Sequence, residues 1–408
     1  MGQVVMSEEA RGRDLGALKG HNQRVVADAI RRSPGGISRT QIAELTGLTP
    51  QSVGNIVRPL MQQGLVIEAG RSSSGGKPRV LLTLNPAGSY TVGVHLDPQQ
   101  LEIVLFDLSG EAVDRTVRPT PRSEQPQKVI DAIARRIQRQ LDQAGIGRDL
   151  VCGVGLAVPG PIDLARGIMI DPPLMPSWRN VSIRQMLEER LNIPVVMEKD
   201  VLAAALGELW LTRAPEPPSF VFVYLGTGTG LAFAQAGRVM RGRTGNSGEI
   251  GHIMSSRPAE ICPHCGGTHV GLSLSPYEWV REGQLAGILP DLGYSAGRRR
   301  IEEHAAMLVA RAAAGEPEAR SVMEPIAFSL AQLASVASDL LDLDEVVLGG
   351  PYWVELAEWM TPLVQRSVNE LTVLHSVRPV RVRSSIRAED VGAVGAASLA
   401  MESFFLTA

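Results

Sequence analysis

The pattern of hydrophobic residues changes near residue 89, and this change limits the possible folds more than any other feature of the sequence. Before it, apolar residues recur with helical spacing, and two short strand-like runs follow. After it, strand-like runs alternate with helical ones, beginning with residues 91–96 and 102–108 and a helix over 126–144. Such alternation is typical of an α/β domain. We therefore expect a small N-terminal domain over residues 1–88 and an α/β domain over residues 89–408.

The formal charge divides at nearly the same place. The first 90 residues carry 11 Lys and Arg against 6 Asp and Glu, whereas the remainder carries 29 against 37. A small basic domain on an acidic body indicates a nucleic-acid partner for the basic part. No stretch of about 18 apolar residues lacks a charge or a breaker, and the first residues have no apolar core of a signal peptide. We therefore expect a cytoplasmic protein with no membrane partner.

The N-terminal domain has the pattern of a helix-turn-helix. A first helix over residues 21–32 is followed by Ser38, an expected N-cap, and by a second helix whose Ile42, Ala43 and Leu45 we expect to face inward. Gly47 supplies a tight turn. Thr49 and Pro50 are then the cap and first residue of a third helix, in which we expect four residues to be buried. These are Val53, Ile56, Val57 and Leu60.

Polar residues on the outer face of the third helix are candidates for reading base edges, since a recognition helix presents its N-terminal half to the major groove. Residues 68–84 then form two strand-like runs around a Gly/Ser loop with basic residues, which we interpret as a β-wing against phosphate or a minor groove. The alternative is a three-helix protein-interaction module with a solvated basic loop. The residues expected to contact DNA are Ser38, Arg39, Thr49, Gln51, Ser52, Asn55, Arg58, Lys77 and Arg79.

Seven short motifs follow one another along the larger domain. They are residues 154–163 (VGLAVPGPID), Pro173-Leu174 with Trp178, residues 200–208 (DVLAAALGE), 226–230 (GTGTG), 248–252 (GEIGH), 346–350 (VVLGG) and 392–397 (GAVGAA). Each motif alone is weak, whereas their order and spacing are specific. Together they resemble the ROK family (repressors, open reading frames and sugar kinases).

The resemblance implies an actin-like, two-lobed sugar-kinase fold preceded by a winged helix-turn-helix, because repressors of the family carry such a domain in the same place. We expect lobe 1 to comprise about residues 89–205 and 388–408, and lobe 2 about residues 206–387.

The resemblance fails at the first phosphate loop of the kinases, where an Asp precedes paired glycines and a Thr. This chain has His95-Leu96-Asp97-Pro98-Gln99 there. Glycines let successive backbone N–H groups curl around a phosphate, whereas proline has no N–H. We therefore expect no phosphoryl transfer, and we interpret the glycines at 226–230 as a structural turn.

The sugar-binding residues of the family are better retained. By resemblance, Asp200 would accept a hydrogen bond from a sugar hydroxyl, Glu249 and His252 would bind further hydroxyls, and Gly160 would lie at the pocket floor. The alternative for Asp200 is a helix cap. The Asn that usually precedes this aspartate is Lys199, and a Glu usual near residues 270–273 is missing, so a phosphorylated or acidic sugar is an option beside a neutral hexose.

A cluster of Cys and His falls where family members carry a structural zinc. The usual ligands are one His and three Cys, whereas this chain offers a C-x2-C-x3-H array, which would complete a tetrahedral site with an upstream His. The expected ligands are His252, Cys262, Cys265 and His269. The family spacing taken literally would select His264 in place of Cys265. The alternative is a pair of free thiols in a loop.

These features predict a ligand-responsive transcriptional regulator, a repressor of carbohydrate-metabolism genes, that senses a sugar or sugar derivative in a non-catalytic domain. As a homodimer or homotetramer it would bind paired half-sites of a double-stranded DNA operator. One alternative is an active sugar kinase that also binds DNA. Another is a regulator with a degenerate pocket that a partner protein controls.

Overall fold

The computed structural model describes most of the chain. The described residues are 15–72, 78–121, 124–212, 217–250, 253, 261, 266–292 and 298–407. Among them, no helix combines the length and the apolar composition that crossing a membrane requires.

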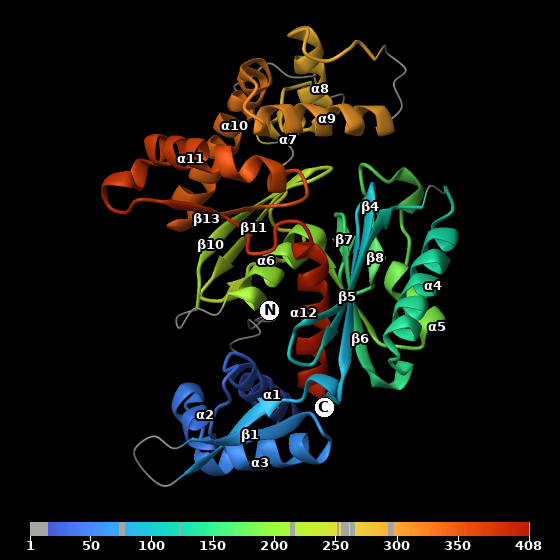
Figure 1. The fold of residues 1–408 in the computed structure, drawn as a ribbon, viewed down its shortest axis with the longest axis vertical. Helices are drawn as coiled ribbons and strands as arrows, with labels where there is room; N and C mark the ends of the chain where they lie inside the picture. The colour runs from blue at the N-terminus through green and yellow to red at the C-terminus, as the bar shows by residue number, and fades with distance from the viewer. Residues whose placement is uncertain are drawn as a thin grey trace, which may run out of the picture.

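The N-terminal domain consists of three helices and an antiparallel hairpin (Figure 1). This is the arrangement that the sequence predicts, although the first helix begins before residue 21. Its elements are α1 (Leu15–Arg31), α2 (Arg39–Thr46), α3 (Pro50–Gln62), β1 (Val66–Ser72) and β2 (Arg79–Leu84).

Local signals set the ends of α2 and α3. The Ser38 hydroxyl accepts from the backbone N–H of Gln41, whose side chain accepts from the Ser38 N–H in return, so a capping box begins α2. Gly47 ends α2 with a φ of 70°, and Thr49 caps α3. The expectation that Leu45 faces inward is wrong, because Leu45 is 71% exposed.

Lobe 1 is a five-stranded sheet in the order β5-β4-β3-β6-β9, in which β3 pairs antiparallel with β4 and parallel with β6. In Figure 1, α4 and α5 cover one face of this sheet and α12 covers the other. The elements are β3 (Tyr90–Leu96), β4 (Gln100–Asp107), β5 (Ala112–Pro119), α4 (Pro126–Ala144), β6 (Val151–Val158), β7 (Ile162–Asp163), β8 (Ile168–Met169), α5 (Ile183–Leu191), β9 (Val195–Lys199) and α12 (Val391–Thr407).

Lobe 2 contains a second five-stranded sheet, in the order β12-β11-β10-β13-β14, and a group of helices packed on it. The strands are β10 (Phe220–Leu225), β11 (Thr229–Gln235), β12 (Arg238–Val239), β13 (Glu345–Gly349) and β14 (Arg381–Ser384). The helices are α7 (Val270–Ser273), α8 (Pro276–Leu285), α9 (Arg298–Ala313), α10 (Pro317–Leu341) and α11 (Trp353–Leu371). Short 3-10 turns span Pro86–Gly88, Arg148–Leu150, Pro176–Trp178 and Val373–Ser376.

The helix α6 (Asp200–Leu211) connects the two lobes and runs unbroken across residue 205, where we expected the lobe boundary. It packs on α12 and also on β10 and β11. The lobe and domain limits given above stay a prediction, because α6 touches both sheets.

The N-terminal domain shares a hydrophobic core with lobe 1. Leu108, Trp210, Met401 and Phe405 pack into one cluster with residues of α1, α2, α3 and the hairpin. In Figure 1 the C-terminal end of α12 lies beside the N-terminal domain. This domain is therefore held against the larger one by packed side chains and does not hang from a free linker.

Candidate functional site: an exposed helix face and an interlobe cleft

The outer face of α3 is free of the core. Gln51, Asn55 and Arg58 are exposed, and Ser52 is half-buried with its hydroxyl 2.9 Å from the Thr49 hydroxyl. A helix that presents polar side chains at this spacing has the geometry that base-edge contact requires.

Of the remaining residues that we expect to contact DNA, three have partners within the chain. Ser38 is 3% exposed and Thr49 is exposed, and both hydroxyls cap helices. Arg39 is half-buried, with its Nη2 3.3 Å from Met61 Sδ. Arg79 is exposed at the start of β2. Lys77 lies outside the described residues.

A cation–π contact joins α1 to the end of α6. The Arg31 guanidinium carbon lies 3.8 Å from the centre of the Trp210 ring, and Arg31 Nη1 donates to the Trp210 carbonyl at 3.0 Å. The Arg31 side chain is only 7% exposed, and Asp28 pairs with it at 2.7 Å. Burial strengthens such a contact, because little water competes for the guanidinium. Trp210 thus fixes the position of α1 on the larger domain.

Four of the expected sugar-binding residues lie together at the start of α6. Lys199 is 4% exposed, and its Nζ donates to Glu249 Oε1 at 2.5 Å and to the Ser247 carbonyl at 3.2 Å. A Cβ on Gly160 would lie 3.0 Å from Lys199 Cε and 3.3 Å from Glu249 Oε1. Asp200 follows Lys199 in the chain as the first residue of α6. His252 lies outside the described residues.

The Asp200 carboxylate has two roles in this geometry. Its Oδ1 accepts from the N–H of the next residue, Val201, at 2.7 Å, whereas the cap position of α6 belongs to Lys199, so the alternative that Asp200 caps the helix is not supported. Burial raises the pKa of Asp200, while the nearby charges of His95 and Lys199 act in the opposite direction. A carboxyl group desolvated in this way is a candidate ligand-binding group.

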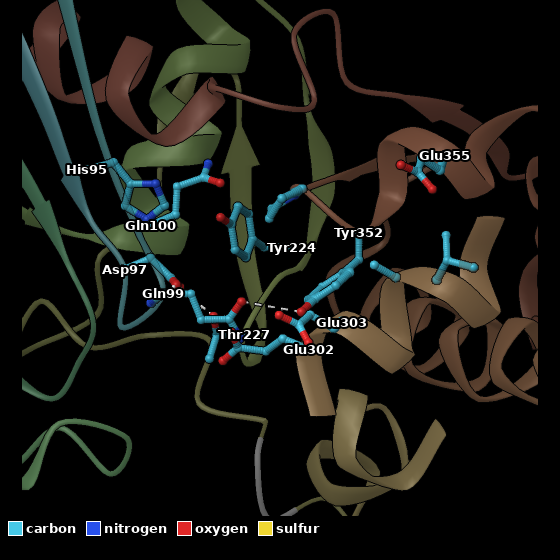
Figure 2. A pocket seen from close by; sticks show the side chains of 13 residues that line it. His95, Asp97, Gln99, Gln100, Tyr224, Thr227, Glu302, Glu303, Tyr352 and Glu355 are labelled. Atoms are coloured by element: carbon cyan, nitrogen blue, oxygen red, sulfur yellow. Dashed lines mark hydrogen bonds between the residues drawn. The ribbon is translucent and has the colours of Figure 1, made fainter. Parts of the chain in front are cut away.

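The turn that replaces the phosphate loop uses its own hydrogen-bond donors. The Asp97 N–H donates to the Gln100 carbonyl at 2.9 Å, and the Gln99 N–H donates to Asp97 Oδ1 at 2.8 Å. Pro98 has no N–H to offer. The Thr227 hydroxyl also donates to Asp97 Oδ1 at 2.6 Å, so this turn bonds directly to the second glycine-rich loop (Figure 2). Residues 97–99 therefore offer no free N–H group to a phosphate.

His95, which stands where the kinases have an aspartate, is buried and paired. It is 3% exposed, and its Nδ1 lies 3.4 Å from Glu102 Oε2. Burial alone would lower the pKa of His95, but the contact with Glu102 and the charges of Asp97 and Asp200 raise it above its ordinary value. His95 and Glu102 therefore form a buried pair, which is ionic when His95 is protonated.

Only one of the four expected zinc ligands is described. His269 is 2% exposed and immediately precedes α7. His252, Cys262 and Cys265 lie outside the described residues, as does the alternative ligand His264. Among the residues that are described, no group of three or more His, Cys, Asp or Glu could hold a metal ion.

Sequence reasoning missed the two residues with the most informative contacts. Trp210 contacts Arg31, which lies 179 positions earlier in the chain. Tyr224 lies in a run of six apolar strand residues and lines the interlobe cavity. Neither has a local signal, because an aromatic residue in an apolar run is most often part of a core.

The fold and these motifs together define a member of the ROK sugar-kinase-like class. The model described as "ROK family" matches residues 91–403, and the chain therefore belongs to the ROK family. The match begins just after the N-terminal domain, so that domain lies outside it.

Curated relatives of the chain include named repressors. The xylose repressor of Bacillus subtilis (strain 168) is 31% identical over 238 residues, which cover 58% of this chain and 61% of that protein. The chain thus spans about three-fifths of the length of this relative. The DNA-binding transcriptional dual regulator NagC of Escherichia coli (strain K12) is 28% identical over 375 residues, 90% of this chain and 88% of that protein.

Solved structures with the same fold include both regulators and kinases. A ROK family transcriptional regulator, described as a homolog of the E. coli MLC protein, has a TM-score of 0.75 at 22% identity and covers 96% of this chain and 98% of its own. The ROK hexokinase from Thermus thermophilus has a TM-score of 0.59 at 27% identity, over 76% of this chain and 96% of its own. The fold alone therefore does not separate regulator from enzyme.

The raised pKa of Asp200 predicts how its removal changes stability. The unfolded chain loses this proton at lower pH than the folded chain does, so the folded state loses stability as the pH rises from the unfolded pKa through the folded one. We expect Asp200→Asn to raise the thermal midpoint relative to wild type at neutral pH and to have less effect at acid pH. Calorimetry at both pH values measures this.

The matched control is Asp171→Asn, at a side chain that is 55% exposed. It should leave the midpoint nearly unchanged at both pH values. A fall in the midpoint of Asp200→Asn at neutral pH would show that the hydrogen bond from the Val201 N–H stabilises the fold by more than desolvation of the carboxylate destabilises it.

Proposed function

We propose that this chain is a ligand-responsive, DNA-binding transcriptional regulator, a repressor of carbohydrate-metabolism genes. The observation that carries the proposal is the path of α6. This helix begins at Asp200 in the sugar-binding cluster and reaches Trp210, which holds Arg31 of the N-terminal domain. One rigid element therefore connects the candidate ligand site to the candidate DNA-binding domain.

DNA binding is supported by the exposed polar face of α3 and by the names of the relatives. Gln51, Asn55 and Arg58 would meet base edges, while Arg79 and Lys77 of the wing would meet phosphate or a minor groove. Ser38 and Thr49 cap helices, so their part would be to aim helix N-termini at the backbone. A homodimer or homotetramer would place two such domains on paired half-sites.

The ligand proposed for the cluster is a sugar derivative, and the ion pair favours one with an anionic group. Lys199 is 5% exposed at its side chain, whereas its partner Glu249 is 61% exposed. A buried ammonium needs an anionic partner, so the exposed glutamate could move away only where a ligand supplies another anion. A phosphorylated or acidic sugar could replace Glu249 at Lys199, while Asp200 accepts from a hydroxyl.

We propose that the chain does not transfer phosphate. Support comes from the turn at residues 97–99, whose N–H groups are used internally or absent. Enzymes that transfer phosphoryl groups depend on hydrogen-bond donors and cations that hold the transferred phosphate. Here an aspartate stands at that position and accepts from Thr227 instead.

The first test concerns DNA contact. Arg58→Ala should weaken binding to a specific operator by roughly 1–3 kcal/mol, because it removes a base-edge contact. Arg79→Ala should weaken binding to all sequences alike and lower the slope of log K against log salt by about one, because it removes a phosphate contact. Fluorescence anisotropy over a salt series distinguishes the two.

Arg166→Ala is the control for charge alone. Its side chain is 74% exposed in the turn between β7 and β8. We expect this variant to bind like wild type. Unchanged binding in both Arg58→Ala and Arg79→Ala would contradict the proposed interface.

The second test concerns the link through Trp210. Arg31→Met keeps the aliphatic stem but removes the cation–π contact and the hydrogen bond to the Trp210 carbonyl. We expect the variant to bind operator DNA but to lose the response to the effector. The effector is first found by thermal shift over neutral, acidic and phosphorylated sugars, including xylose and N-acetylglucosamine, and the response is the change in operator affinity.

Arg32→Met is the matched control, since Arg32 also pairs with Asp28, whereas the guanidinium over the Trp210 ring is that of Arg31. It should keep the full response. A normal response in Arg31→Met would mean that the signal travels by another route.

A structural zinc is a further part of the proposal. The family resemblance and the burial of His269 support it, since imidazole ligands of structural zinc sites are typically held within the fold. His252, Cys262 and Cys265 would complete the site. Because His252 follows Glu249 in the chain by three residues, the metal would position this segment for the ligand.

Elemental analysis of protein prepared without chelator tests the zinc site. Cys262→Ser and Cys265→Ser should each remove about one equivalent of zinc, while Cys152→Ser, at a partly buried cysteine of lobe 1, should keep it. Retention in Cys265→Ser together with loss in His264→Ala would select the alternative ligand. Wild-type protein without bound zinc would show that these cysteines are free thiols in a loop and do not form a metal site.

A further inference from the structure

A cavity of about 380 Å³ lies between the lobes, outside the sugar cluster. It is bounded by the turn between β3 and β4, the end of β10, the helix α9 and the start of α11 (Figure 2). A cavity of this size suits a small organic molecule. The functions proposed above do not use it.

The charged side chains of the cavity wall are mostly negative. Of the 13 residues that line it, four are carboxylates and none is Lys or Arg, although Arg299, outside the lining, pairs with Glu303 at 3.1 Å. The single histidine, His95, faces Glu102 at 3.4 Å, so its charge is balanced when it is protonated. The carboxylates are Asp97, Glu302, Glu303 and Glu355.

Tyr224 gives independent evidence that the cavity is built for a ligand. The residue is 7% exposed and lines the cavity, and no hydrogen bond of its hydroxyl is seen among the described residues; the neighbouring His95 Nε2 is buried and also has no partner among them. A phenol that is buried so far normally has a partner. Burial raises the pKa of Tyr224 well above its ordinary value, so the hydroxyl stays neutral and able to donate or accept.

The surrounding side chains are held in place before any ligand arrives. Tyr352 packs edge-on against Trp279, with ring centres 5.5 Å apart, and its hydroxyl donates to Gln99 Oε1 at 3.4 Å. Asp97 is fixed by Thr227. Figure 2 shows Tyr224 between His95 and Tyr352, with Glu302 and Glu303 beside Tyr352. Fixed groups lower the cost of ordering the site on binding.

We propose that this cavity binds a small organic cation, an amine or guanidinium on a short carbon chain or ring. The carboxylates would attract the positive group, the tyrosine rings would contact the carbon body and the charge, and the Tyr224 hydroxyl would pair with a polar atom. A nucleotide carries several negative charges and meets no Lys or Arg on this wall. The proposal does not depend on DNA binding.

The experiment is calorimetric titration of the full chain with matched pairs of probes. Tyramine and tyrosol differ only in an ammonium against a hydroxyl, and putrescine and 1,4-butanediol differ in the same way at both ends. We expect at least one amine to bind and its alcohol to bind at least about tenfold more weakly, the effect of losing a charge-assisted hydrogen bond. ATP with Mg²⁺, and Mg²⁺ alone, complete the panel.

Variants place the binding in the cavity. The double variant Glu302→Gln/Glu355→Gln should weaken binding of the amine by at least about tenfold. Tyr224→Phe should also weaken this binding without unfolding the protein. Glu358→Gln/Glu370→Gln is the control, because these exposed residues of α11 lie outside the cavity and their loss changes the net charge equally. Circular dichroism confirms that each variant is folded.

Three outcomes would overturn the proposal. Amines that bind no better than their alcohols would show that the carboxylates only solvate this face. Amine binding that the control pair weakens as much as the cavity pair would indicate attraction to the whole acidic surface. Tighter binding of ATP with Mg²⁺ than of any amine would assign the cavity to a nucleotide.

Discussion

The close contact between the backbones of α6 and α12 is the constraint on which the rest of the molecule depends. A Cβ on Gly395 would lie 1.7 Å from the Ala203 carbonyl oxygen, and one on Gly207 would lie 2.4 Å from the Val391 oxygen. Only glycine allows such an approach. The two helices therefore pack as one unit, with α12 against the sheet of lobe 1 and α6 against that of lobe 2. Both also reach the N-terminal domain, through Trp210 and Phe405.

This unit explains how a ligand between the lobes can influence a domain at the far end. Asp200 begins α6, and the Lys199 ion pair with Glu249 lies beside it. A tightly packed helix transmits displacement because close-packed interiors deform little. At its other end the helix presents Trp210 to a buried guanidinium, a contact that depends on ring position and orientation. A ligand that changes the angle between the lobes would therefore act on α1.

Much of the fold could be predicted because its signals are local. The caps at Ser38 and Thr49 and the glycine turn at Gly47 depend on neighbouring residues, and all three are present. The prediction that Leu45 faces inward was wrong, because helical periodicity identifies an apolar face but does not show how far the neighbouring elements cover it. The contact of Trp210 with Arg31 and the cavity at Tyr224 are set by residues far apart in the chain, and no spacing rule reaches them. The Lys199 pair with Glu249 was missed for the same reason, although both residues were candidates for the site.

The loss of the phosphate loop changes the chemistry of the cleft more than the absence of glycine alone suggests. In this chain Asp97 does not lie open to a metal or a phosphate, because it accepts from both the Gln99 N–H and the Thr227 hydroxyl. The same carboxylate therefore ties the β3–β4 turn of lobe 1 to the glycine-rich loop of lobe 2. The wall of the cleft has four carboxylates and no lysine or arginine, although Arg299 pairs with one of the four, so its charge favours a cation over a phosphate. The interlobe space of this chain therefore differs in charge from a site that holds phosphate groups with hydrogen-bond donors and cations.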